Sequence, residues 1–541
     1  MNLLKKLVAF IATMFAVGVF GTLNVSATSN TDTATLKITN IEGNPTVKLY
    51  KIGTGEYNAN NDSFIKFKYE NGVSLTETGP TSQEITKIAN DINKGTISLT
   101  PVDVKNNVSD TYTYQATGAG VYIAILTGAT DGRTYNPVLL AASYNGEGIL
   151  KGGEVSSKAN YLYGQTTVAK STLPSIKKEV SNTTKDGDKD TASVGQELTY
   201  KLTVQLPSYA KEAVNKTVYI SDTMSAGLMF DYSSLAVKWN GKTATISSDG
   251  SVMVDGMKIA TARHVGNGFN LSFVYDALNY ISPEVSYKAV VNEKAVVGNT
   301  GNTNNAELFY SNHPTNGSTY ENLDKKPEQG NGITKKEDKK IVYTYQVAFK
   351  KIDSKTKNPL ANAIFGIYDS SNKLVDTVTT NNAGYAVSTQ VSAGTYTIKE
   401  LKAPKGYSLN TNTYTVTASQ TTATITTNVA STKTEYTTDV NQAGNDKSPV
   451  GWLKNNIFYL KKPSDDAKPA YIKSTSTTTA TAQTMKTTGT AGTAVLTTDI
   501  PNTKLGELPS TGGIGTLLFT MIGVVVMAAT AGIYVLKHKK S

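Results

Sequence analysis

Alternating apolar and polar positions dominate this chain. Runs rich in Thr, Val, Ile and Tyr recur along it, and clusters of Gly, Asn, Asp and Ser separate them. Examples are TATLKITN, TVKLYKI, LTYKLTVQL, TVYISDT, YTYQVAFKKID, GTYTIKEL and YTVTAS. An apolar residue at every second position is typical of strands with one buried face. The pattern therefore predicts an all-β protein built of tandem β-sandwiches.

One stretch follows a helical rather than a strand-like period. Between Thr81 and Gly95 the apolar residues Ile85, Ile88, Ala89 and Ile92 recur at helical spacing. Thr81 and Glu84 form a capping box at the start, and Gly95 supplies a stop signal. We expect a short helix here, inside the first domain.

The length of the exported chain favours about three domains. The strand-like starts TLPSIKKEV at 172 and KKIVYTYQVAFKKID at 339 are typical of domain entries. We therefore expect domains at 28–170, 171–335 and 340–505. The run STSTTTATAQTMKTTGTAGT, within 474–493, has low complexity and predicts a long loop or stalk.

Both ends of the chain carry export and anchoring signals. Residues 1–27 have a basic start, an apolar stretch and small residues before a cleavage point after Ala27, which is the layout of a secretory signal peptide. Residues 514–536 carry no charge and match the length of a transmembrane helix. The basic tail at the end, Lys537–Lys540, is expected to stay on the cytoplasmic side. The intervening chain is then outside the cell.

Composition narrows the function classes. Cysteine is absent, so this exported protein cannot be braced by disulfides. The formal net charge is +10, but the lysines are scattered, and we expect no nucleic-acid partner. The three histidines, His264, His313 and His538, are dispersed and no phosphate loop or nucleophile elbow occurs, so we expect no cofactor, no metal site and no enzymatic turnover.

A lysine, an acid and an asparagine each interrupt an apolar strand face in two domains. Residues of equal parity share one face of a strand, so each interruption falls on the expected core side. In the second domain the interrupting residues are Lys178 (with Ile176 and Val180), Asp222 (with Val218 and Ile220) and Asn312 (with Leu308 and Tyr310). In the third domain they are Lys351 (with Val347 and Phe349), Glu400 (with Tyr396 and Ile398) and Asn502 (with Leu496 and Ile500).

Burial gives these trios a chemistry. It lowers the pKa of a lysine and raises that of a carboxyl group. A neutral lysine amine beside a protonated acid can attack an asparagine amide and expel ammonia, which leaves a Lys–Asn isopeptide bond. We therefore expect Asp222 and Glu400 to promote two self-modification events. Such bonds would replace the missing disulfides as stabilisers.

The partner asparagines have alternatives. In the second domain Asn305 is the second choice after Asn312. In the third domain Asn428 also comes after Glu400 at a plausible distance, but Asn502 keeps phase with its apolar neighbours whereas Asn428 does not. Each trio could instead be surface polar residues on edge strands. The first domain shows no such trio, and we expect no cross-link in it.

The C-terminal segment resembles the cell-wall sorting signal of Gram-positive surface proteins. The pentapeptide Leu508-Pro509-Ser510-Thr511-Gly512 is followed by the apolar span and the basic tail, in that order. The resemblance implies that a sortase cleaves between Thr511 and Gly512 and passes the threonine to an amine. The rival interpretation is a single-pass anchor preceded by a chance match.

Further resemblances point to major, or backbone, pilins. Thr167-Val168-Ala169-Lys170 is similar to the end of the pilin motif, which implies that Lys170 receives the threonine of the next subunit; otherwise it is an exposed linker lysine. PSIKKEV, VYISDTMSAGL and NTNNAELFYSNHP resemble the isopeptide-forming second pilin domain. FKKIDSKTKNPLANAIFGIYD and TYTIKELKAPKGY resemble the collagen-adhesin B-type domain with its E-box. The implied sandwiches are immunoglobulin-like.

This family implies a subunit of a covalently polymerised, cell-wall-anchored surface pilus. The implied partners are a class C pilus sortase, a housekeeping sortase, other copies of the chain, ancillary pilins and peptidoglycan. Ligands on host surfaces are a further class of partner that this resemblance leaves undecided. The alternatives are a monomeric wall-anchored adhesin, which would need a ligand-binding region and would not use Lys170, and a minor basal pilin.

Overall fold

The structure is a computed structural model. It describes residues 27–76, 80–145, 147–155, 162–163, 166–298, 300–330, 332–419, 429–444, 447–479 and 492–506. The expected signal peptide up to residue 26 and the whole segment 508–541, with the LPSTG motif, lie outside these residues. None of the described helices has the length and apolar character that a bilayer crossing needs.

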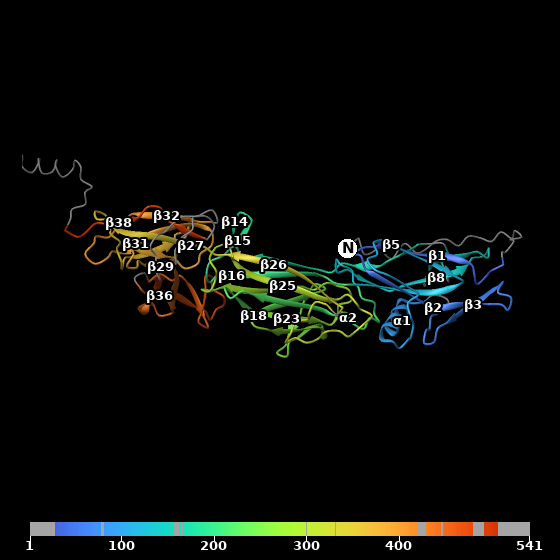
Figure 1. Ribbon diagram of the computed structural model, residues 1–541. Coiled ribbons are helices and arrows are strands. Elements are labelled where there is room, and N and C mark those ends of the chain that lie inside the picture. Colours follow the sequence, from blue (N-terminus) through green and yellow to red (C-terminus); the bar gives the residue numbers. More distant parts are fainter. Residues whose placement is uncertain are drawn as a thin grey trace, which may run out of the picture.

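Three β-sandwiches succeed one another along a long axis (Figure 1). The predicted all-β fold is confirmed, because nearly every described element is a strand. We call the sandwiches the first module (residues 33–172), the second module (175–343) and the third module (346–502). Each is built around its own hydrophobic core.

The first module contains a helix and two main sheets. Its elements are β1 (Thr33–Ile41), β2 (Thr46–Tyr57), β3 (Phe64–Tyr69), α1 (Ser82–Lys94), β4 (Asp103–Lys105), β5 (Asp110–Thr117), β6 (Gly120–Thr127), β7 (Thr134–Tyr135), β8 (Val138–Tyr144), β9 (Leu150–Glu154), β10 (Leu162–Tyr163), β11 (Thr167–Val168) and β12 (Ser171–Thr172). The sheet order is β11-β1-β5 against β10-β9-β8-β6-β2-β3, with β4 paired to β2.

The predicted helix is confirmed as α1. The Thr81 hydroxyl accepts from the Glu84 N–H, the Glu84 carboxylate accepts from the Thr81 N–H, and Gly95 ends the helix with φ 75°. Ile88 and Ile92 pack on the outer face of the β6–β8 sheet. Because the opposite face of that sheet packs on the sandwich core, β6 and β8 are buried on both sides and show continuous apolar runs.

The second module is the largest sandwich. Its elements are β13 (Ser175–Ser181), β14 (Thr184–Asp186), β15 (Lys189–Thr191), β16 (Glu197–Gln205), β17 (Val218–Met224), β18 (Leu228–Trp239), β19 (Lys242–Thr243), β20 (Thr245–Ile246), β21 (Ser251–Val254), β22 (Met257–His264), β23 (Gly268–Phe273), α2 (Tyr275–Leu278), β24 (Glu284–Val291), β25 (Asn302–Ser311) and β26 (Ile333–Tyr343). A five-stranded sheet, β13-β16-β24-β18-β19, packs on a nine-stranded sheet, β14-β15-β26-β25-β17-β23-β22-β21-β20.

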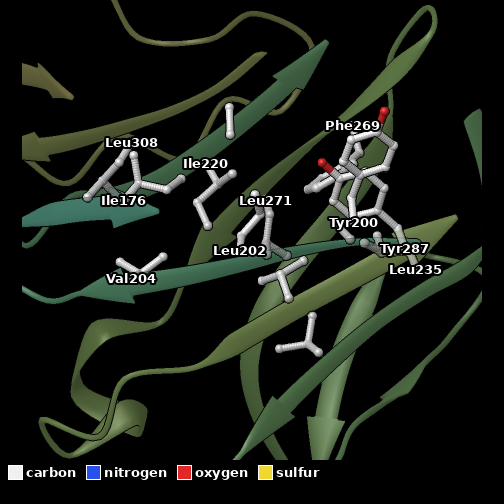
Figure 2. Close-up of a cluster of buried hydrophobic side chains, with 14 of the residues drawn as sticks. Ile176, Tyr200, Leu202, Val204, Ile220, Leu235, Phe269, Leu271, Tyr287 and Leu308 are labelled. Atoms are coloured by element: carbon white, nitrogen blue, oxygen red, sulfur yellow. The ribbon is translucent and has the colours of Figure 1, made fainter. Parts of the chain in front are cut away.

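The second module has an aromatic core and a long final strand. Figure 2 shows the core, in which Tyr200, Tyr287 and Phe269 lie close together beside aliphatic side chains from both sheets. Strand β26 pairs with β25 along its whole length and runs through the interval 335–340, where we expected one domain to give way to the next. The chain enters the third module only at β27 (Gln346–Asp353).

The third module is a smaller sandwich with an added sheet. Its further elements are β28 (Ile364–Tyr368), β29 (Leu374–Thr379), β30 (Tyr385–Val387), β31 (Gly394–Lys402), β32 (Thr413–Ala418), β33 (Val429–Thr437), η1 (Val440–Gln442), β34 (Gly451–Lys454), β35 (Ile457–Tyr459), β36 (Lys468–Thr479), β37 (Thr493–Val495) and β38 (Ile500–Asn502). One sheet has the strand order β30-β27-β37, with β38 also paired to β27. It packs against a second sheet with the order β29-β28-β31-β32. The added sheet has the order β33-β36-β34-β35.

The added sheet corrects one expectation. Residues 474–479 belong to strand β36, where we expected a loop, and they pair with β33. The β-branched Thr residues of this run suit a strand once a partner strand is available. The rest of the low-complexity run, 480–491, lies outside the described residues.

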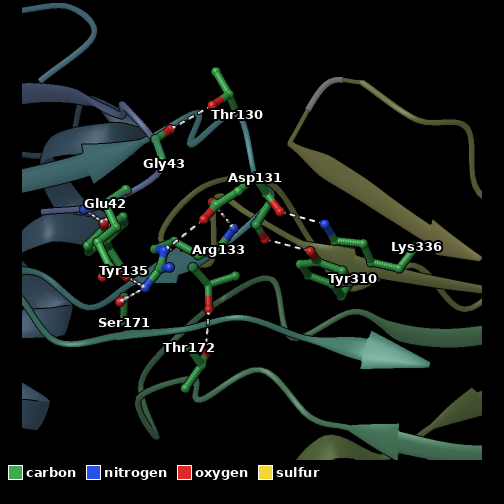
Figure 3. A network of polar contacts seen from close by, with 12 residues as sticks. Glu42, Gly43, Thr130, Asp131, Arg133, Tyr135, Ser171, Thr172, Tyr310 and Lys336 are labelled. Carbon is green, nitrogen blue, oxygen red and sulfur yellow. Dashed lines mark hydrogen bonds and ion pairs between the residues drawn. The ribbon is translucent and has the colours of Figure 1, made fainter. Parts of the chain in front are cut away.

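The joint between the first and second modules is polar. Figure 3 shows the loop around Arg133. Arg133 forms ion pairs with Glu42 and Asp131 and donates to Ser171 Oγ. From the second module, Tyr310 donates to the Gly132 carbonyl and Lys336 donates to the Asp131 carbonyl, each at 2.5 Å. The loop of the first module is thus held by strands β25 and β26.

Candidate functional site

Lys178 is buried in the second module. Strand β13 alternates exposed and buried positions, and this alternation places Lys178 on the core side, where its side chain has no exposed surface. Its Nζ donates to Asp222 Oδ2 at 2.6 Å and to Asn304 Oδ1 at 2.5 Å. The structure therefore brings together the expected lysine and the expected acid, but with an asparagine that we did not predict.

Asn304 corrects the choice of asparagine in the second module. Asn304 and Asn312 share parity and therefore one side of the chain, but Asn312 comes after the end of β25 and donates to Thr334 Oγ1 at 2.8 Å. Asn305, the second choice, pairs with Lys339 and faces the opposite side of the sheet. The alternation of side chains identified the correct face of the strand, but it does not show which asparagine on that face lies next to the lysine.

The electrostatics of this site favour neutral groups. Burial lowers the pKa of Lys178 to about 8, against the opposing effect of Asp222. Burial raises the pKa of Asp222, and the nearby Lys178 acts in the opposite direction and lowers it. The lysine Nζ also lies 5.5 Å from the ring centre of Tyr200 and 5.8 Å from that of Tyr287. The protonation state with a neutral lysine amine and a protonated carboxyl group is therefore more populated here than it would be in water.

The third module contains the second site. Lys351 on β27 is fully buried and donates to Asn502 Oδ1, and its Nζ lies 3.3 Å from Glu400 Oε1. Asn502 Nδ2 donates to the same carboxylate oxygen at 2.9 Å. The structure thus brings all three expected residues together. Burial lowers the pKa of Lys351 to about 8. Asn428, the alternative partner, lies outside the described residues.

Local features hold the third-module site in place. Strand β38 pairs with β27 in parallel, with Ile500 opposite Lys351, so that Asn502 comes to the lysine from the neighbouring strand. Glu400 comes from the facing sheet, and its Oε2 accepts from the Asn410 N–H at 2.6 Å. The ring of Phe365 lies 5.6 Å from Lys351 Nζ. The carboxylate, the amine and the amide are therefore fixed by different elements.

The two sites differ in how they span the sandwich. In the second module Asp222 and Asn304 lie on neighbouring strands of one sheet, β17 and β25, and Lys178 reaches them from the other sheet. In the third module the lysine and the asparagine share a sheet, and the acid comes from the opposite one.

Among the residues that the structure describes, Lys178 and Lys351 are the buried lysines.

Lys170 lies on the surface of the first module. It comes just after β11, which pairs in parallel with β1, and the alternation buries Thr167 and Ala169 while Val168 and Lys170 point outward. The Lys170 carbonyl accepts from the Asn136 N–H at 3.1 Å, next to the joint with the second module. The other expected anchor residues, Leu508, Pro509, Ser510, Thr511 and Gly512, lie outside the described residues.

Two residues of the second-module site were not predicted from the sequence. Asn304 carried the same phase signal as Asn312, in the run NTNNAELFYS. Tyr287 donates to Asp222 Oδ2 at 2.6 Å and accepts from Asn304 Nδ2 at 3.1 Å. Its only sequence signal is its place at an apolar position of EVSYKAVV, which any core tyrosine would share.

Comparisons with known proteins give consistent matches along the chain. Residues 31–171 match the T6 antigen Ig-like domain, residues 194–314 the Cna-B-like domain of Gram-positive pilin backbone subunit 2, residues 345–433 a prealbumin-like fold domain, and residues 500–541 the LPXTG cell wall anchor motif.

Two relatives cover most of the chain. The trypsin-resistant surface T6 protein of Streptococcus pyogenes serotype M6 is 62% identical over 538 residues, which are 99% of this chain and 100% of the relative. The solved structure of the T6 backbone pilin of serotype M6 Streptococcus pyogenes, described as a modular three-domain structure, is 61% identical with a TM-score of 0.80. It covers 89% of this chain and 100% of the solved one.

Proposed function

Because this chain belongs to the Gram-positive backbone pilins, we propose that each of its two buried lysine sites closes one intramolecular isopeptide bond. The chain is a structural subunit of a surface pilus, and it carries an LPXTG cell wall anchor. The proposed bonds join Lys178 to Asn304 and Lys351 to Asn502.

The burial of two lysines against asparagine amides carries this proposal. A charged lysine in a dry core is costly, and a structural protein without cysteine gains little from keeping two of them unreacted. Removing the charge by amide formation turns this cost into a permanent cross-link. The acid in each site is the group that such a reaction requires.

The reaction balances without any added reagent. In the third module, the neutral Lys351 amine attacks Cγ of Asn502 and a C–N bond forms. The Glu400 carboxyl group takes one proton from the attacking nitrogen and gives one to Nδ2, because its Oε1 lies near both. The Cγ–Nδ2 bond then breaks and ammonia leaves. The acid ends as it began, so the event occurs once and is not turnover.

Intact mass tests this proposal. We would make the exported region, residues 28–506, which leaves out the expected signal peptide and the LPSTG segment. The wild-type mass should be lower than the sequence mass by two ammonia molecules. Glu400→Gln should keep the ammonia that the third-module site would otherwise lose, and Asp222→Asn should keep the ammonia of the second-module site. A wild-type mass equal to the sequence mass would overturn the proposal.

We further propose that subunits are linked head to tail, from Thr511 of one copy to Lys170 of the next. The exposure of Lys170, which comes just after the edge strand β11, supports this, because an incoming acyl group needs a free and accessible amine. A class C pilus sortase would perform the transfer. A housekeeping sortase would attach the finished polymer, with its ancillary pilins, to peptidoglycan.

Polymer formation on cells tests this linkage. Lys170→Ala should abolish the ladder of high-mass polymers in cell-wall extracts. Lys37→Ala is the matched control, because Lys37 is an exposed lysine on the neighbouring strand β1, and it should leave the ladder intact. A ladder that survives Lys170→Ala would contradict the assignment. The absence of any ladder from the wild-type chain would favour a solitary adhesin or a minor basal pilin.

A further inference from the structure

Tyr287 lies inside the second-module site. It comes from β24, in the sheet that also contains Lys178, and faces Asp222 and Asn304 on the opposite sheet. Its side chain is 1% exposed. The ring stacks on Tyr200, with centroids 5.6 Å apart, and meets the edge of Phe269. This packing fixes the direction in which the hydroxyl group points (Figure 2).

The hydroxyl group of Tyr287 connects the acid to the asparagine. It donates to Asp222 Oδ2 at 2.6 Å and accepts from Asn304 Nδ2 at 3.1 Å. Nδ2 is the atom that must leave as ammonia when the bond forms. Tyr287 therefore touches both the proton-carrying group and the leaving group.

The third-module site achieves the same connection without a tyrosine. There Asn502 Nδ2 donates directly to Glu400 Oε1 at 2.9 Å. In the second module Asp222 Oδ2 is used by Lys178 and Tyr287, and Asp222 Oδ1 has no hydrogen-bond partner among the described residues. The Tyr287 hydroxyl group, which bonds to both Asp222 Oδ2 and Asn304 Nδ2, supplies the connection between acid and amide in this site.

We propose that Tyr287 is a catalytic residue that relays a proton from Asp222 to the departing nitrogen of Asn304. The inference rests on the proposed Lys178–Asn304 bond and adds a residue to that reaction. It also divides the two sites into two designs, a direct one with glutamate and a relayed one with aspartate and tyrosine.

The relay balances. The Lys178 amine forms the new bond to Cγ of Asn304. Once this bond has formed, Nδ2 is no longer a planar amide nitrogen and can accept a proton, so both hydrogen bonds of the Tyr287 hydroxyl group reverse. The Asp222 carboxyl group then passes a proton to the Tyr287 oxygen, which passes its own proton to Nδ2, and the Cγ–Nδ2 bond breaks to release ammonia. Asp222 recovers a proton from the attacking Lys178 nitrogen. Both Asp222 and Tyr287 return to their starting forms.

The test is a time course of bond formation in Tyr287→Phe, which keeps the ring and removes the hydroxyl group. Residues 28–506 would be made by cell-free synthesis, synthesis would be stopped, and the Lys178–Asn304 product would be measured over time by peptide mass. We expect its formation to be slower by about 100-fold. Tyr200→Phe is the matched control, because Tyr200 stacks on Tyr287 and is equally buried, but no hydrogen bond joins its hydroxyl group to Asp222. It should react at the wild-type rate.

The third module reports on folding and on the proposed function in the same molecules. The Lys351–Asn502 bond should form normally in Tyr287→Phe, which shows that the chain was made and folded. Near-ultraviolet circular dichroism that matches Tyr200→Phe shows that the second core is packed. If Tyr287→Phe forms the Lys178–Asn304 bond at the wild-type rate, the relay is overturned and the proposed function stands. If the wild type forms no such bond, the proposed function itself fails.

Discussion

Lys178 Nζ and Asn304 Oδ1 lie 2.5 Å apart, although the two residues belong to opposing sheets of the second module. In the third module Lys351 and Asn502 lie on neighbouring parallel strands of one sheet. A bond at the first place would join two sheets, and a bond at the second would join the first and last strands of a sandwich. The consequences for stability and for load differ accordingly.

Loss of either bond should destabilise its own module. A cross-link that closes a loop of more than a hundred residues stabilises a fold by about 4 to 5 kcal/mol on a chain-entropy account. Asn304→Ala should therefore lower the unfolding temperature of the second module strongly. Asn312→Ala should remove only the hydrogen bond to Thr334, worth about 1 kcal/mol. Calorimetry of the two variants checks this, and equal effects would contradict the choice of Asn304.

The two modules should respond differently to pulling. After Asn304 the chain still has to traverse β25 and β26 before it leaves the second module, so residues 305–343 stay on the load path. Asn502, by contrast, ends the last strand of the third module. Single-molecule stretching should show one step of at most roughly 130–140 Å from the second module, and none from the third. A step of a whole module would mean that its bond is absent.

Bond formation should depend on pH through the lysines. Burial lowers the pKa of Lys351 from 10.5 to about 8, so its reactive neutral fraction grows as pH rises towards 8 and saturates above it. The initial rate of the Lys351–Asn502 reaction should fall about tenfold from about pH 7 to about pH 6. Freshly synthesised subunits transferred to a series of buffers would show this. A rate that is still rising above about pH 9 would mean that the lysine has an ordinary pKa.

Gly132 should be critical for the joint between the first two modules. It has φ +80°, and a Cβ there would lie 2.7 Å from the Tyr310 hydroxyl oxygen. Gly128 has φ +72° with open space around it, so Gly128→Ala carries the backbone strain alone. Gly132→Ala should be less stable than Gly128→Ala by about 1 kcal/mol, the worth of the Tyr310 hydrogen bond. Equal unfolding free energies of the two variants would show that this contact contributes nothing.

Much of the fold could be predicted from local pattern. Strands with one buried face reveal themselves by alternation, and helix α1 by the contacts of Thr81 and Glu84, because both signals are contained in a few neighbouring residues. The strand over 474–479 could not be predicted. This segment forms a strand because it pairs with β33, which lies far away in the sequence.

The candidate sites show the same division. Strand phase identified Lys178, Asp222, Lys351, Glu400 and Asn502, because a polar residue on an apolar face is visible within one strand. It could not separate Asn304 from Asn312, because their parity is the same and the register between β17 and β25 selects Asn304. Tyr287 was not identified, because its role depends on two partners on another sheet.

Peptide mapping of the exported region tests the central claim most directly. Protease digests of residues 28–506 would be analysed by tandem mass spectrometry for branched peptides. We expect one that joins Lys178 to Asn304 and one that joins Lys351 to Asn502, each lighter than the sum of its two parts by one ammonia molecule. Unbranched peptides that contain all four residues with their amides intact would contradict the account.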